Sequence, residues 1–179
     1  GGSGADVLDG GVGTNDAADY STAVAAVTLS LATGGTAGDA AGDTFKFVEF
    51  VYGSAHNDSI TGDAAINRLV GNAGADTMHG GAGNDYLVGG AGNDVLWGDT
   101  GQDVFEYAGA FGNDTINGFE AGLGRTDRIW LQGQGVANFA TLMSTATDSA
   151  LGITLHVNGG DIFLAGIHTA NLVADDFIL

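Results

Sequence analysis

Aspartate recurs at a fixed interval over the middle of the chain, each time after a glycine-rich stretch. Between residues 53 and 106 the sequence divides without a gap into six rows of nine, each beginning with glycine. The sixth position of these rows holds Asp58, Asn67, Asp76, Asp85, Asp94 and Asp103. A seventh row, 109–117, follows a two-residue insertion and supplies Asp114, and residues 1–9 form a further copy that supplies Asp6. Oxygen-bearing side chains at such regular spacing predict a series of similar sites for a hard cation.

The rest of each row explains how these side chains are positioned. The first six residues form a turn, where glycine reaches backbone angles that other residues avoid. The last three form a short strand, so the eighth residue faces inward while the seventh and ninth face outward. The eighth position is apolar in all six rows: Ile60, Leu69, Met78, Leu87, Leu96 and Phe105. Two rows make one coil, which predicts a column of Asp58, Asp76, Asp94 and Asp114 and another of Asn67, Asp85 and Asp103.

Stacked carboxylates repel one another strongly where the effective dielectric constant is low. The chain has 22 acidic residues against four basic ones, a net charge of −18, so it either stays disordered or binds cations. Carboxylates and backbone carbonyls are hard oxygen ligands that suit Ca²⁺. Ions bridging successive coils would lie between 58/76, 76/94, 94/114, 67/85 and 85/103, which predicts about five shared Ca²⁺ sites. Nucleic acid is excluded as a partner, because the sequence has no basic patch to meet its phosphates.

The pattern Gly-Gly-x-Gly-x-Asp-x-apolar-x resembles the RTX calcium-binding nonapeptide repeat. The resemblance implies an all-β fold, a right-handed parallel β-roll, in which glycine carbonyls at turn positions two and four add ligands. In this chain those glycines are Gly74, Gly81, Gly83, Gly90, Gly92 and Gly101. Asn72 and Asp99 stand at position two of their turns, where a carbonyl is still present. The turn at Gly62 departs most, with Ala65 at position four and Asn67 at position six, so we expect a weak site there.

No catalytic motif accompanies the repeats. The chain has no cysteine, which excludes disulfides and thiolate zinc sites, and no apolar run of about 18 residues that could span a membrane. The histidines form no His-Glu-x-x-His pattern and the serines no Gly-x-Ser-x-Gly turn, so we expect no enzyme activity within this chain. Tyr86 and Trp97 are predicted to point outward as an aromatic pair on a flat sheet face. Such a pair could bind a glycan or a partner protein. The more common reason for exposed aromatic residues is a crystal or oligomer contact.

The flanks of the regular rows break the period. The chain is therefore predicted to have three regions: N-terminal coils with a non-repeat insertion over 1–52, the regular β-roll over 53–117, and a C-terminal cap over 118–179. In the first region, either Asn15 or Asp16 takes the ligand position of an irregular turn. Alternation of apolar residues predicts strands at 27–31 and 44–51. Between them, Asp39 and Asp43 are either Ca²⁺ ligands or residues of a solvated loop.

The C-terminal region carries different signals. Strands at 153–157 and 161–164 flank Asn158-Gly159-Gly160, which predicts a hairpin, and 138–149 fits a short helix. An exposed roll end is an open sheet edge, so we expect this region to cap it. The stretch 112–131 resembles the one that follows the roll in serralysin-type proteases. Residues 174–179 resemble a C-terminal signal for type I secretion, with a final packed strand as the alternative.

The sequence thus predicts a calcium-binding module of a secreted, extracellular bacterial protein. The acidic, glycine-rich chain would stay unfolded in the low-calcium cytosol, pass through a type I exporter, and fold outside on Ca²⁺ at about 10⁻⁴–10⁻³ M. Because the sequence begins within a repeat, we expect a longer protein. Two alternatives of other classes remain open: an adhesin module that binds glycan or a cell surface, and an appendage of a secreted hydrolase or epimerase.

Overall fold

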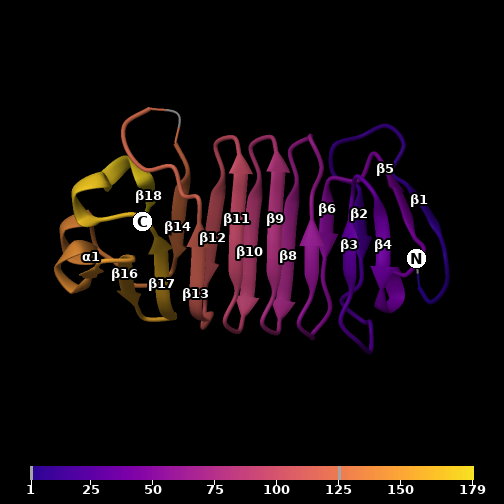
Figure 1. Cartoon of the computed structure of the whole chain (residues 1–179), viewed down its shortest axis with the longest axis horizontal. Coiled ribbons are helices and arrows are strands. Elements are labelled where there is room, and N and C mark those ends of the chain that lie inside the picture. The colour runs from indigo at the N-terminus through magenta and orange to yellow at the C-terminus, as the bar shows by residue number, and fades with distance from the viewer. Residues whose placement is uncertain (1, 125) are drawn as a thin grey trace.

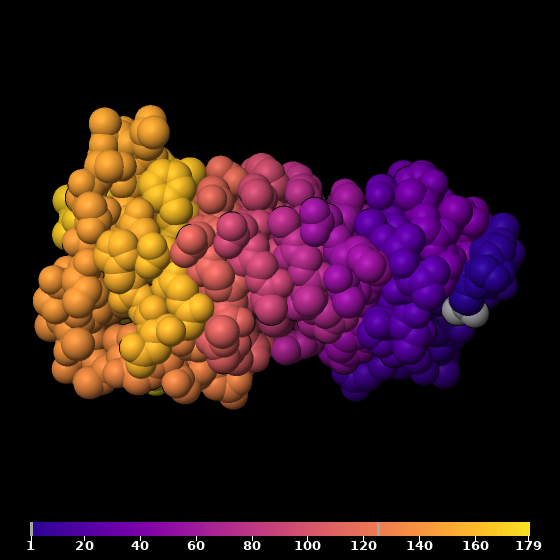
Figure 2. Space-filling view, turned by 90° about the horizontal axis from the view of Figure 1, so that it is seen from below, coloured from indigo at the N-terminus to yellow at the C-terminus, as the bar shows by residue number. Residues whose placement is uncertain are grey.

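The computed structural model describes residues 2–124 and 126–179 as an elongated roll of strands with a broader C-terminal end (Figure 1; Figure 2). One sheet has seven strands, in the order β18 (Phe177–Ile178), β14 (Arg128–Gln132), β12 (Val104–Ala108), β10 (Tyr86–Ala91), β8 (Arg68–Ala73), β6 (Phe50–Tyr52) and β2 (Ala17–Asp19). The other has nine, in the order β15 (Thr147–Ser149), β16 (Gly152–Val157), β17 (Gly160–Ala165), β13 (Gly112–Asn117), β11 (Val95–Thr100), β9 (Thr77–Ala82), β7 (Ser59–Thr61), β3 (Thr28–Ser30) and β4 (Gly34–Ala37). The chain is an all-β parallel roll, as the repeats predict.

The pairing of strands confirms that two rows make one coil. Leu69 of β8 lies beside Leu87 of β10, and Met78 of β9 lies beside Leu96 of β11, both in parallel register. The eighth-position side chains of all six rows are fully buried: Ile60, Leu69, Met78, Leu87, Leu96 and Phe105. Consecutive rows therefore alternate between the two sheets and line one continuous apolar core.

The N-terminal coils are longer than the regular ones. β1 (Val7–Asp9) pairs with β5 (Thr44–Lys46) in a separate two-stranded sheet, while β2 pairs with β6 and β3 with β7. The strand predicted over 27–31 is confirmed as β3. The strand predicted over 44–51 is wrong in one respect: it is two strands, β5 and β6, because the chain turns between them at Phe47, where φ is 51°.

The C-terminal region packs against the last coil. β16 and β17 form the predicted hairpin, and β17 also continues the parallel sheet by pairing with β13. The helix predicted over 138–149 is shorter: α1 spans Phe139–Thr145, capped by Asn138, and β15 follows it. No helix in the described ranges is long and apolar enough to cross a membrane.

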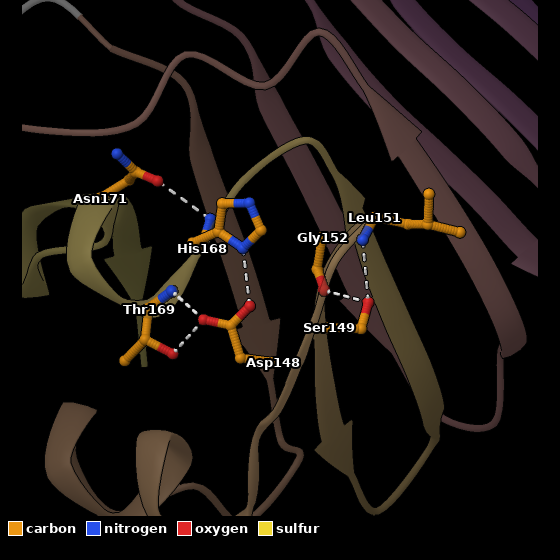
Figure 3. Close-up of polar contacts among 7 residues, drawn as sticks. All are labelled: Asp148, Ser149, Leu151, Gly152, His168, Thr169 and Asn171. Carbon is orange, nitrogen blue, oxygen red and sulfur yellow. Dashed lines mark hydrogen bonds and ion pairs between the residues drawn. The ribbon is translucent and has the colours of Figure 1, made fainter.

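One polar cluster fastens the segment after β17 to the edge of the nine-stranded sheet (Figure 3). The Asp148 carboxylate on β15 pairs with His168 Nδ1 at 2.7 Å and accepts hydrogen bonds from the Thr169 amide and hydroxyl, each at 2.9 Å. These bonds lower the pKa of Asp148 to about 2, with the His168 contact the largest cause. The segment then leads to β18, which pairs with β14.

Candidate metal sites

The two predicted columns of position-six side chains are present as stacks along the edges of the roll. In each step, one carboxylate oxygen accepts a hydrogen bond from the backbone amide of the position-six residue one coil earlier. Asp76 Oδ1 accepts from the Asp58 amide at 2.7 Å, and Asp94 Oδ1 from the Asp76 amide at 2.8 Å. Asp103 Oδ1 accepts from the Asp85 amide at 2.8 Å. The eighteen-residue coil therefore places consecutive carboxylates directly above one another.

The second oxygen of five of these carboxylates has no partner. The Oδ2 atoms in question are buried and make no hydrogen bond within the described part of the chain: those of Asp76, Asp85, Asp94, Asp103 and Asp114. A buried polar atom without a partner is costly, and a buried charge more so. Five such atoms in two stacks therefore point to a positively charged group that completes them.

Burial raises the pKa of these carboxyl groups, and neighbouring aspartates add to the effect. The pKa rises to about 8 at Asp114, about 7 at Asp76 and Asp103, and about 6 at Asp85. Without a cation, these carboxyl groups ionise less readily in the folded roll than in the unfolded chain, and Asp114 stays largely protonated at neutral pH. A bound divalent cation would reverse this preference, because it stabilises the charged form.

The backbone of the turns suits an oxygen-binding cation. The six glycines predicted to supply carbonyls all have positive φ: Gly74, Gly81, Gly83, Gly90, Gly92 and Gly101. A Cβ atom at Gly101 would overlap the carbonyl oxygen of Gly83, and one at Gly92 would overlap that of Gly74, so these turns stack too closely for a side chain. In the residues described, no three His, Asp or Glu side chains converge on one point. A cation here would therefore take most of its ligands from carbonyls, and a set of hard oxygens fits Ca²⁺.

Three predicted ligands are placed differently from these five. Both oxygens of Asp58 accept hydrogen bonds from protein groups. The Oδ1 atom of Asn67 accepts from the Asp63 amide at 2.8 Å, while its buried amide nitrogen has no acceptor in the described structure. Asp6 is half-buried, and its amide donates to Asp43 Oδ1 at 2.8 Å.

The stacks have two further members: Asp43, for which the sequence left a Ca²⁺ ligand and a solvated loop as alternatives, and Asp127, which sequence reasoning missed. Asp43 lies above Asp6, and Asp127 continues the column of Asp103, whose amide donates to Asp127 Oδ1 at 3.0 Å. Each is followed two residues later by an apolar residue, a signal that the repeats also carry and that could have revealed them. At the irregular first turn, Asp16 rather than Asn15 directly precedes β2, and its Oδ2 is buried without a partner among the described residues.

The predicted aromatic pair is wrong. Tyr86 lies on β10 of the seven-stranded sheet and Trp97 on β11 of the nine-stranded sheet, because adjacent rows alternate between sheets. Trp97 stacks instead on His79, with ring centroids 4.4 Å apart. The glycan-binding interpretation therefore loses the pair on which it was based.

Comparison with known proteins agrees with this geometry. Residues 52–87 and 79–109 match the family model of the RTX calcium-binding nonapeptide repeat. Among solved structures, the chain is similar to the solution structure of the AlgE6R3 subunit from the Azotobacter vinelandii mannuronan C5-epimerase. The two are 28% identical with a TM-score of 0.57, and the match covers 69% of this chain and 78% of that one. No curated protein matches the chain. Both comparisons support RTX calcium-binding repeats over residues 52–109.

Proposed function

We propose that this chain is a module whose folding is driven by extracellular Ca²⁺ and that it supports the export and stability of a larger secreted protein. The observation that carries the proposal is the set of five buried aspartate oxygens in the two stacks that have no partner among the described residues. Ca²⁺ binds about six to eight oxygen atoms and supplies the positive charge that these stacks need. About five or more ions per chain would offset much of the net charge of −18.

Binding and folding are then a single event, since the stacked carboxylates and carbonyls do not meet in the unfolded chain. In a cytosol with little Ca²⁺, mutual repulsion and the large backbone entropy of glycine favour the unfolded chain. An unfolded chain suits passage through a type I exporter. Outside the cell, Ca²⁺ at about 10⁻⁴–10⁻³ M folds the roll.

A second candidate is the role of an appendage to a secreted enzyme. The similarity to a repeat subunit of a mannuronan C5-epimerase favours it, because that subunit belongs to an enzyme while having a similar fold. The two roles are compatible, since a roll that folds on Ca²⁺ outside the cell can also stabilise a catalytic domain beside it.

A calcium titration of the purified chain tests the folding role. Starting from excess chelator, we expect a cooperative gain of β-structure by circular dichroism and a smaller radius by X-ray scattering. Mg²⁺ should substitute poorly, because it requires octahedral geometry and loses its water reluctantly. A chain that is fully folded in excess chelator would refute the proposal.

The export role needs its own test. The chain is produced in a bacterial host with and without a type I exporter, and the medium is analysed for the intact protein. We expect it outside the cells only when the exporter is present. Retention inside the cells in both cases would refute export and leave the folding role unaffected.

A further inference from the structure

The turns of the regular rows fall into two classes that differ at their second residue. In the turns that end at Asp76, Asp85, Asp94 and Asp103, this residue has a positive φ: 75° at Asn72, 106° at Gly81, 102° at Gly90 and 65° at Asp99. In the turns that end at Asp58 and Asn67, the second residues Ser54 and Asp63 do not adopt a positive φ. We call the first class open turns and the second class closed turns.

In a closed turn, the second residue's amide points at the position-six side chain. The Ser54 amide donates to Asp58 Oδ2 at 2.5 Å, and the Ser54 hydroxyl donates to Asp58 Oδ1 at 2.7 Å. The Val27 amide also donates to Asp58 Oδ1, at 2.7 Å. The Asp63 amide donates to Asn67 Oδ1 at 2.8 Å. Each closed turn thus presents an N–H group where a cation would need an oxygen atom.

The peptide that enters the first closed turn is held on both sides. While its N–H group bonds Asp58, its carbonyl oxygen, on Gly53, accepts a hydrogen bond from Asn72 Nδ2 at 2.7 Å. A flip of this peptide would exchange the two groups and bring the carbonyl into the turn. The flip requires a positive φ at Ser54, which an L-residue with a Cβ atom adopts at a cost and glycine adopts freely.

In an open turn, the second residue belongs to the preceding strand. The strands before the open turns are six residues long, and within them Asn72 pairs with Gly90 and Gly81 with Asp99. By contrast, β6 and β7, which precede the closed turns, are three residues long. Among the six regular rows, the four open turns are the ones whose position-six carboxylate keeps a buried Oδ2 without a partner in the described part of the chain. Asp114, beyond the two-residue insertion, also has such an oxygen and belongs to neither class.

We propose that, in the six regular rows, the residue at turn position two determines whether a turn binds Ca²⁺, and that the turns 53–58 and 62–67 bind none. The calcium columns then begin at Asp76 and Asp85. Asp58 and Asn67 are structural: Asp58 Oδ2 and Asn67 Oδ1 each accept a hydrogen bond from an amide of their own turn. The inference rests on the calcium binding proposed above and adds to it which turns take part.

Removal of the position-six side chains tests the two classes. The number of bound ions is measured by isothermal titration calorimetry of the full chain at saturating Ca²⁺. Asp58→Asn should leave this number unchanged, whereas Asp76→Asn should lower it by about one. If Asp58→Asn also lowers it, the inference is overturned. A wild-type chain that binds no Ca²⁺ would instead refute the proposed function itself.

Conversion of closed turns into open ones is the sharper test. Ser54→Gly should add about one ion, while Ser54→Ala, which removes the same hydroxyl but keeps the Cβ atom, should add none. At the second turn, Asp63→Gly and Asn67→Asp should each add none, and the double variant about one, because both the flip and a carboxylate are needed. Folding of each variant is checked by circular dichroism at saturating Ca²⁺. Unchanged binding in both the folded Ser54→Gly chain and the folded double variant would overturn the inference, as would a gain in Ser54→Ala.

Discussion

The regular coils and the C-terminal cap bury aspartates in different ways. In the regular coils, five carboxylates have one oxygen bonded to an amide and the other without a protein partner. In the cap, Asp127 accepts from the Asp103 and Glu120 amides, both at 3.0 Å, and Asp176 accepts from the Gly122 and Val173 amides, both at 2.8 Å. The buried acids of the cap are thus completed by backbone amides, whereas five acids of the coils keep one oxygen for a cation. We therefore expect dependence on Ca²⁺ to be a local property of this fold, confined to the turns that do not satisfy their own carboxylates.

The largest effect is expected from removing the cap. Deleting residues 132–179 removes β17 and β18, which cover the edges of β13 and β14, and an uncovered end should fray inward. Ca²⁺ should then fold the repeats poorly, although the carboxylates of the four open turns and that of Asp114 all remain. Emission from Trp97 reports the transition, with Trp130→Phe in both chains as a matched background. Equal calcium midpoints and slopes in the full and shortened chains would show that the cap does not stabilise the coils.

Substitution of one aspartate from each region separates the two modes of burial. Asp94→Asn should raise the calcium midpoint by about tenfold, which corresponds to about 1.4 kcal/mol for a weakened ligand. Asp127→Asn should leave the number of ions unchanged but lower the free energy of unfolding by about 1–3 kcal/mol, because its new NH₂ group would face an amide donor. Calorimetry gives the calcium midpoint and the number of ions, and urea unfolding in Ca²⁺ gives the free energy of unfolding. A change in the number of bound ions with Asp127→Asn would show that the buried acids of the cap bind Ca²⁺ as those of the coils do.

pH should affect the coils in opposite directions with and without Ca²⁺. The pKa values of Asp76, Asp85, Asp103 and Asp114 rise to about 6–8 in the folded chain, above their usual value of 3.8. In chelator, the folded state is therefore most favoured below about pH 4 and loses this stability as pH rises through 6–8. With Ca²⁺, protons compete with the ion, so the calcium midpoint should rise as pH falls from 8 to 6. Circular dichroism at several pH values follows both trends, and a pH-independent midpoint would contradict them.

The smallest effect is expected at Asp148, in the cap and on the surface. Asp148→Asn should loosen the segment that begins at His168, seen as faster hydrogen exchange of the Thr169 amide, with no change in calcium binding. Because the pKa of Asp148 is lowered to about 2, its contribution is present above about pH 4 and lost as pH falls towards 2. Asp161→Asn, which removes the exposed pair with His156, is the matched control and should leave Thr169 unaffected. Unchanged exchange at Thr169 in the Asp148 variant would show that the contact is dispensable.

The nine-residue period was enough to predict the coils, because each row specifies its own turn, carboxylate and inward residue. The stacking of Asp76 on Asp94 and the burial of Leu87 followed from that period alone. The period does not specify whether the N–H or the carbonyl of an individual peptide group points into the turn. Ser54 and Asn72 are both polar residues at turn position two, yet only Asn72 adopts a positive φ. The long N-terminal coils were also beyond reach, since their pairs, such as Leu8 with Phe45, join segments that a long insertion without the nine-residue period separates.

The insertion before Asp114 shows what lengths this architecture accepts. Two extra residues are absorbed in the turn, and β11 and β13 still pair with Leu96 beside Ile116. A whole extra row would have a different outcome, because consecutive rows alternate between sheets. Every later strand would change sides, and β13 and its partner β17 would do so together, so the cap would keep its contacts with the last coil. The same cap can therefore close an array that has gained or lost a single row, and only its side relative to the N-terminal coils changes.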